Sequence, residues 1–327
     1  MLQIIPKLSL LDAEKEFKKV IKGIQLRGYL NAPPVSVTGG IKWDIEDGKI
    51  KPLSVGDITN IFCPSRRDIY MRRVLKTKGR MNWGRLTGHL VESCIYGFTD
   101  KYKNDNTIDR IRTYGGLSRR ASLFIKDFSK KNKKEVSELT KFKSIPEEDE
   151  NWLLCQLSYA LRYELFMLLA TRKLSGNKSN SEVIQNIEIK PNPKVLGISS
   201  PSTPDFIIPA ISAIGDIKTG FEFKDYYRLA AAGYALAYEN QKGEGNEINF
   251  GLIYYFPTRQ KYISFAHLYI FTIDDALRQE FLDRRDEALF VMKNALSATK
   301  AVPAFAERDK YCNHCKYSND CDELRKK

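Results

Sequence analysis

The segment from 183 to 273 constrains the fold of this chain more than any other part of the sequence. It contains β-rich runs separated by turn residues, then the Ala-rich stretch YYRLAAAGYALAYE at 226–239, then two more β-rich runs, NFGLIYYFP and KYISFAHLYIFTI. Short β-rich runs bounded by Pro, Gly and Ser predict strands, whereas Ala and Leu favour helix. The order strands, helix, strands predicts an α/β core with a mixed sheet.

Helical patterns surround this core. Apolar residues at helical spacing predict helices over 10–27, near 54–75, and over 83–98, 152–174 and 274–299, and turn-forming residues predict loops at 31–40 and 175–182. We therefore divide the chain into an N-terminal helix and loop at 1–50, a helical region at 51–182, the α/β core at 183–273, and a C-terminal helix with a cysteine-bearing tail at 274–327.

The chain is strongly basic. Lys and Arg number 53 against 40 Asp and Glu, a net charge of +13, and residues 101–143 alone carry 13 basic and 5 acidic side chains. Such an excess favours a polyanionic partner such as nucleic acid, although a solvated basic surface has the same composition. No run approaches the roughly 20 apolar residues of a membrane span, and the N-terminus lacks the order of a signal peptide. We expect a cytoplasmic protein without a membrane partner.

Two aspartates and a lysine form the main candidate for a catalytic site. Asp205 follows Pro204, and after ten intervening residues comes Asp216-Ile217-Lys218. On a strand Asp216 and Lys218 project from one face, and a hairpin would bring Asp205 beside them. Carboxylates that share a face repel each other unless a cation lies between them, and oxygen ligands suit Mg²⁺ or Mn²⁺. A half-exposed strand with alternating charge is the purely structural alternative.

The order Asp…Asp-x-Lys-Thr-Gly, followed by a helix, resembles the RecB-like branch of the PD-(D/E)xK nuclease superfamily. The resemblance implies a restriction-endonuclease-like nuclease core at 183–273. It also implies that Asp205 and Asp216 hold Mg²⁺ or Mn²⁺. A lysine in the position of Lys218 would orient or deprotonate the attacking water and offset charge on the phosphate.

Two helices carry further parts of this resemblance. The branch has a Q-x-x-x-Y motif on the helix after the strand, and Tyr234 matches its tyrosine as a catalytic residue, but Ala230 stands where the glutamine would be. Upstream, Gly84-Arg-Leu-Thr-Gly88-His89 is similar to the histidine motif of the branch, which implies that His89 is a further metal ligand. Glu92, on the same helical stripe as His89, is a secondary candidate.

The cysteines indicate a second site. Three of the six lie within ten residues of the tail, in the pattern C-x2-C-x5-C, and clustered cysteines in a non-secreted chain indicate a metal or redox site. Four thiolates fit zinc or an iron–sulfur cluster, whereas a Cys3His set fits zinc. Cysteines within apolar helical patterns are typical of the core, as at Cys94 and Cys155. The tail cysteines are Cys312, Cys315 and Cys321, and the candidates for a fourth ligand are Cys63, His314, Cys94 and Cys155.

Cys63 is followed by proline and then by a basic run, CPSRRDIYMRR. This context, together with the tail cysteines and the Asp…Asp-x-Lys order, resembles the fourth core CRISPR-associated (Cas) protein family, in its type I-A branch. The resemblance implies a 4Fe–4S cluster that closes the helical region over the core. It also implies a divalent-metal-dependent deoxyribonuclease, an exonuclease on single strands or DNA ends, which trims prespacer ends in CRISPR adaptation beside the first and second Cas proteins. The implied cluster ligands are Cys63, Cys312, Cys315 and Cys321.

We also predict that basic residues after Cys63 contact the DNA strand together with Tyr234, namely Arg66, Arg67, Arg72 and Arg73. Two alternatives stay open at this point. One is a non-catalytic DNA-binding accessory protein of the integration complex. The other is the nuclease subunit of a recombination helicase–nuclease, whose motor would be another polypeptide because this chain has no G-x-x-x-x-G-K-[ST] loop.

Overall fold

The computed structural model describes part of the chain. The described residues are 3–5, 51–59, 63–79, 83–102, 114–132, 134, 184–185, 187–209, 212–220, 223–243, 245–257, 267–296, 302–305, 307, 312 and 315–326. The helices predicted over 10–27 and 152–174, the loops at 31–40 and 175–182, and about half of the basic segment 101–143 lie outside these residues.

One six-stranded mixed sheet forms the centre of the described fold, in the order β1-β6-β5-β4-β3-β2. Its central strands β4 and β5 are parallel, and the other pairs are antiparallel. The crossover from β4 to β5 contains helix α9, so the predicted order of strands, helix and strands is confirmed. The sequence analysis missed β1, which pairs with β6 at one edge. The strands are β1 Gln3–Ile5, β2 Ile184–Gln185, β3 Phe206–Ile208, β4 Ala213–Gly220, β5 Phe250–Pro257 and β6 His267–Thr272.

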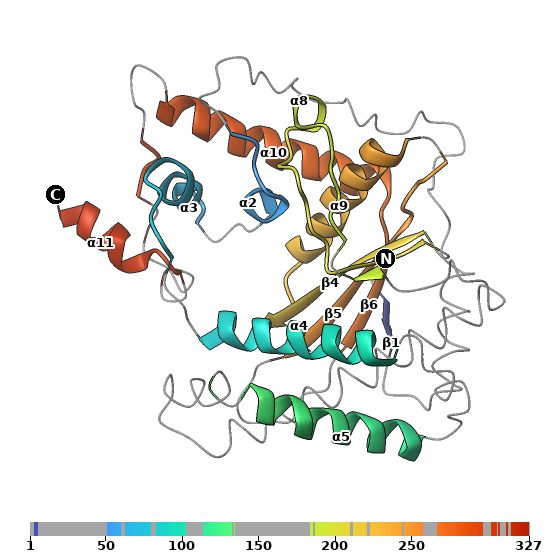
Figure 1. The fold of residues 1–327 in the computed structure, drawn as a ribbon. Helices are drawn as coiled ribbons and strands as arrows, with labels where there is room; N and C mark the ends of the chain where they lie inside the picture. Colours follow the sequence, from blue (N-terminus) through green and yellow to red (C-terminus); the bar gives the residue numbers. More distant parts are fainter. Residues whose placement is uncertain are drawn as a thin grey trace.

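Helices cover both faces of this sheet (Figure 1). The helices α9, Tyr226–Lys242, and α10, Asp275–Leu296, lie on the face to which Ile214 points. Helix α4, Trp83–Tyr102, lies against the opposite face, with α5, Tyr114–Lys131, on its far side. The helices predicted over 83–98, 226–239 and 274–299 therefore correspond to α4, α9 and α10.

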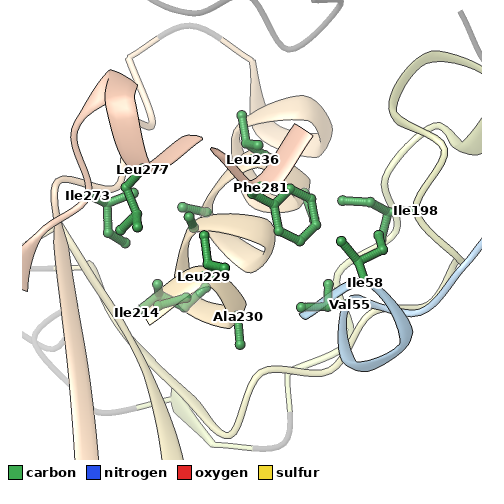
Figure 2. Close-up of a cluster of buried hydrophobic side chains, with 14 of the residues drawn as sticks. Val55, Ile58, Ile198, Ile214, Leu229, Ala230, Leu236, Ile273, Leu277 and Phe281 are labelled. Atoms are coloured by element: carbon green, nitrogen blue, oxygen red, sulfur yellow. The ribbon is translucent and has the colours of Figure 1, made fainter. Parts of the chain in front are cut away.

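The core between α9, α10 and the sheet is packed closely enough to require small residues. Four alanines of α9 are fully buried, and Figure 2 shows Leu229 of this helix between Ile214 of the sheet and Phe281 of α10. At Gly233 an added Cβ would lie 2.3 Å from the ring of Phe281. The Ala-rich composition of α9 thus has a packing role besides its helix propensity, because it lets α10 approach closely.

The helical pattern predicted near 54–75 is not one helix. It is divided into α2, Val55–Thr59, α3, Arg67–Ile69, and a π-helical turn η1, Tyr70–Val74. Helix α2 begins with a reciprocal cap, in which Asp57 N donates to Ser54 Oγ and Ser54 N donates to an Asp57 carboxylate oxygen. Pro64 and the left-handed conformation of Arg66, with φ of 56°, separate α2 from α3.

Two short helices complete the described fold, α8, Pro193–Leu196, and α11, Ser318–Lys326. Helix α11 and the C-terminus lie on the same side of the molecule as α3 (Figure 1). Among the described helices, none combines the length and the apolar character that a membrane span requires.

Candidate active site

The predicted hairpin brings the two aspartates and the lysine together. Phe206 of β3 pairs with Gly215 of β4, so the same register places Asp205 opposite Asp216. The backbone N–H of Ile217 donates to Asp205, and the ammonium of Lys218 forms an ion pair with Asp216. Because β3 begins only at Phe206, the end of β4 that carries Lys218 extends beyond its partner on that edge.

The electrostatics of this cluster follow from its burial. The side chain of Asp216 is 5% exposed and that of Lys218 is 27% exposed. Burial raises the pKa of the Asp205 carboxyl well above its usual range, and a hydrogen bond to Asp216 and the charges of Asp216 and Glu92 raise it further. Burial alone would lower the pKa of Lys218, but Asp216 and Asp205 outweigh this effect and raise it. These shifts keep Lys218 charged and favour the protonated form of the Asp205 carboxyl.

Helix α4 reaches this cluster through a face that the sequence analysis identified only in part. Tyr96 donates a hydrogen bond of 3.0 Å to Asp205 Oδ1. Burial and the neighbouring charges of Asp205 and Glu92 raise the pKa of the Tyr96 phenol. His89 lies at an exposed position of the same helix. Glu92, rather than His89, is the α4 side chain whose charge acts on Asp205 and Lys218.

Tyr234 of α9 lies close enough to the cluster to be affected by its charges. Burial raises the pKa of its phenol well above its usual range, and Asp216, Asp205 and Glu92 add to this effect. Ala230, one turn earlier, is buried in the core, so the position of the missing glutamine is filled by packing. No group of three or more His, Cys, Asp or Glu side chains within the described ranges is arranged to hold a metal ion.

The predicted cluster cysteines come together in part. Cys63 and the tail cysteines Cys312, Cys315 and Cys321 are partly buried. Burial raises the pKa of the Cys315 thiol, the backbone N–H of Tyr317 opposes this, and Asp68, Cys63 and Cys312 add to the increase. Cys63 therefore lies close to the C-x2-C pair although 249 positions separate it from Cys312. Cys94 is buried in the core, as predicted, whereas Cys155 and His314 lie outside the described residues.

A second contact, independent of the cysteines, holds the tail against the region after Cys63. Arg67 donates to the backbone carbonyl of Pro303, and its guanidinium carbon lies 3.7 Å from the ring centre of Phe305. The guanidinium of Arg325, on α11, lies 5.1 Å from the same ring centre. These cation–π contacts fix the tail to α3.

The basic residues after Cys63 are placed differently from the prediction. Arg66 is 2% exposed and donates to the backbone carbonyls of Asp57 and Ile58, and Arg67 is 5% exposed. A buried guanidinium is not available to a DNA backbone, so the predicted DNA contact is wrong for these two residues. Arg72 and Arg73 both pair with the carboxylate of Asp57, and the side chain of Arg72 remains 44% exposed. A DNA contact by Arg72 or Arg73 stays a prediction.

The fold and this site define a mixed α/β protein with a carboxylate–lysine cluster on its central strand β4. Comparison with known families identifies the chain further: a family model described as CRISPR-associated exonuclease Csa1 matches residues 25–322, and the chain belongs to this family. A protein of Saccharolobus solfataricus (strain P2) with the same description is 38% identical over 88 residues. The matched segment is 27% of this chain and 29% of that relative, so less than a third of the relative is covered. The resemblance to a type I-A Cas nuclease family is confirmed.

Proposed function

We propose that this protein is a divalent-metal-dependent deoxyribonuclease of CRISPR adaptation, acting as an exonuclease on single strands or DNA ends. The observation that carries the proposal is the contact of Asp205, Asp216 and Lys218 at the end of β4 that extends beyond β3. The description of the family and of the Saccharolobus solfataricus relative as an exonuclease supports it.

Asp205 and Asp216 are the residues that would hold the cation. Their oxygens suit Mg²⁺ or Mn²⁺, and Asp216 Oδ2 forms the ion pair with Lys218. A bound divalent cation supplies a water of lowered pKa and compensates charge on the phosphate. In its absence the raised pKa of Asp205 favours a proton on this carboxyl, which reduces its repulsion with Asp216. Cation binding should therefore release this proton.

Lys218 and Tyr234 would act on the substrate side. The Lys218 ammonium stays charged beside Asp216, so it would orient the attacking water or offset negative charge that grows on the scissile phosphate. Tyr234 keeps its phenolic proton because of its raised pKa, so its hydroxyl would serve as a hydrogen-bond donor to the strand rather than as a base.

The exposed face of α5 would bind the DNA backbone away from the site. Phe124 of α5 packs edge to face on Phe98 of α4, with ring centres 5.2 Å apart, which turns the opposite side of α5 to solvent. Basic side chains dominate this side, although Asp127 is also exposed. The exposed basic residues of α5 are Arg119, Lys126, Lys130 and Lys131.

We further propose that Cys63, Cys312, Cys315 and Cys321 hold a 4Fe–4S cluster. The proximity of Cys63 and Cys312 to Cys315 supports this proposal, and the Arg67–Phe305 contact holds the tail in place independently. A Cys3His zinc site that includes His314 is the competing assignment. Iron content and a broad absorption band near ~400 nm in anaerobically purified protein would support the cluster. Colourless protein with stoichiometric zinc would overturn it.

The biological substrate would be prespacer ends, processed beside the first and second Cas proteins. The test uses 5′-labelled and 3′-labelled single strands and duplexes, incubated with Mg²⁺, Mn²⁺ or a chelator. We expect shortening from the ends that requires a divalent cation, with the label giving the polarity. Tight DNA binding without cleavage under any of these conditions would favour the accessory-protein alternative.

A further inference from the structure

Five aromatic rings of the described residues gather where the chain passes from β4 to α9, and we call them the aromatic cluster. Phe223, which lies in the connection before α9, has its ring centre 4.1 Å from that of Tyr269 on β6. The same ring meets Tyr227 of α9 and Tyr255 of β5 edge to face, with ring centres 5.5 and 5.7 Å away. Tyr226 packs on Tyr227, with ring centres 5.0 Å apart. Because edge-to-face pairs are a favoured arrangement, these contacts hold Phe223 and Tyr226 in place.

The aromatic cluster adjoins the lysine of the candidate active site. Strands β4 and β5 are parallel, and their register pairs Lys218 with Tyr255. Paired residues of neighbouring strands project from the same face of a sheet, and such strands lie about 4.8 Å apart. The hydroxyl of Tyr255 donates a 2.8 Å hydrogen bond to the carbonyl of Gly220, the last residue of β4. The side chains of Lys218 and Tyr255 therefore leave the sheet side by side at this end of β4.

The aromatic cluster is fully buried on its inner side only. Tyr227, Tyr255 and Tyr269 are buried, whereas Phe223 and Tyr226 pack against the core and remain partly exposed. The three buried rings thus support two rings that keep part of their surface open. A satellite of the hydrophobic core is the purely structural alternative, but the open ring surface lies next to the residues proposed for catalysis.

Positive charge accompanies the two partly exposed rings. The sequence from 223 to 228 is Phe-Lys-Asp-Tyr-Tyr-Arg, so Lys224 lies between the rings in sequence and Arg228 follows them on α9. The guanidinium of Arg228 lies 3.5 Å from the carboxylate of Asp225, which is 87% exposed, so solvent screens this pair. Aromatic rings beside cations suit a single nucleic-acid strand, because bases stack on the rings and phosphates meet the cations. A purely apolar ligand would gain nothing from the two cations.

We propose that Phe223 and Tyr226 form a stacking platform for unpaired bases of the DNA strand beside Lys218. The proposal rests on the proposed function, because this strand is the substrate of the nuclease, and it names unpaired nucleotides as what the site holds. Bases that are splayed out of a stack are open to aromatic side chains, whereas bases inside an intact duplex are not. The platform therefore favours single strands over duplex.

The test measures the affinity of the full chain for two fluorescently labelled strands of equal length, in chelator and at constant salt. One strand is oligothymidine, and the other has the same backbone with every base removed. We expect Phe223→Leu to weaken binding of oligothymidine by about fivefold or more, since stacking on one ring contributes at least this factor. Binding of the abasic strand should not change, because it offers no base to the ring.

Two variants serve as controls. Phe223→Tyr keeps an aromatic ring and should bind oligothymidine about as tightly as the wild type. Phe290→Leu makes the same change as Phe223→Leu at an exposed phenylalanine of α10, and it should leave both affinities unchanged. Thermal melting shows whether each variant folds. If Phe223→Leu does not fold, Tyr226→Leu makes the same comparison with the same expected loss.

The outcomes separate this proposal from the proposed function. Equal losses of affinity for oligothymidine and for the abasic strand would show that the ring acts through the fold, and unchanged affinity for both would show that it does not act at all. Either result would overturn the platform while the nuclease assignment stands, and so would a wild type that cleaves duplex ends but binds no single strand. A wild type that neither binds nor cleaves DNA would overturn both.

Discussion

Replacement of Asp57 tests whether the basic residues after Cys63 stabilise the fold. The carboxylate of Asp57 is 2% exposed and accepts hydrogen bonds from Ser54 N and Oγ, from Arg72 Nη1 at 2.7 Å and from Arg73 Nε at 2.9 Å. Burial alone would raise the pKa of Asp57, but Arg73, Ser54 and Arg72 outweigh it and hold the pKa below its usual range. One side chain therefore caps α2 and ties η1 to it.

The cost of Asp57→Ala can be summed from these contacts. Loss of a helix cap costs about 1 kcal/mol. Loss of the hydrogen bonds of Arg73, whose side chain is 25% exposed, costs about 2–3 kcal/mol. Arg72 is 44% exposed, so solvent screening limits its share to about 0–1 kcal/mol. We expect Asp57→Ala to lower the free energy of unfolding by about 4 kcal/mol, and Arg72→Ala by less than about 1 kcal/mol.

Urea denaturation at constant salt, with equal m-values in wild type and variant, measures this loss. Because the folded-state pKa of Asp57 is lowered, its contribution is present above the usual value near 3.8 and disappears as the pH falls through the folded-state pKa. The difference in the free energy of unfolding between wild type and Asp57→Ala should therefore become smaller at acidic pH. A loss below about 1 kcal/mol at neutral pH would refute the reasoning and leave Arg73 available for DNA.

Three further predictions follow from the packing, the basic face of α5 and the cysteines. Gly233→Ala should destabilise the protein by about 1–3 kcal/mol in urea, because the ring of Phe281 overrides the gain in helix propensity; a stabilised variant would contradict the close packing. If about six phosphates are neutralised, a plot of the logarithm of the binding constant for single-stranded DNA against the logarithm of the salt concentration has a slope of about −4. Replacing the four exposed basic residues of α5 by acidic ones should reduce the magnitude of this slope by about 3. An unchanged slope would show that α5 is a solvated surface. Cys63→Ala should lose iron and melt at a lower temperature, since loss of this ligand opens a very long loop. Cys94→Ala should keep its iron and show a packing defect only. Full iron content in Cys63→Ala would refute the role of Cys63 as a ligand.

The site could be predicted where the chemistry is local in sequence. Asp216 and Lys218 are two residues apart on one strand, so strand geometry alone puts them on one face, and the hairpin places Asp205 beside them. Helical spacing likewise placed His89 and Glu92 on one stripe of α4. Spacing does not show how the helix is rotated against the sheet. That rotation depends on the contact between Gly88 and Thr219, which is a property of tertiary packing.

The errors in the fold have similar physical causes. A run of basic residues predicts an exposed surface. However, the left-handed turn at Arg66 directs the guanidinium of this residue to the carbonyls at the end of α2. The pattern near 54–75 has helical periodicity on both sides of Pro64, and periodicity does not show that the chain turns between them. Strand β1 has three residues, too few for any alternation, and its pairing with β6 is a long-range contact.

The most direct test of the nuclease assignment compares cleavage and DNA binding in Asp216→Asn. Asp225→Asn is the matched control, because Asp225 is the same residue type nearby with a side chain that is 87% exposed. In single-turnover assays with Mn²⁺, we expect Asp216→Asn to cleave at least about 100-fold more slowly than the wild type while it binds the same DNA. Asp225→Asn should cleave at the wild-type rate. Cleavage by Asp216→Asn at the wild-type rate would contradict the assignment of the site.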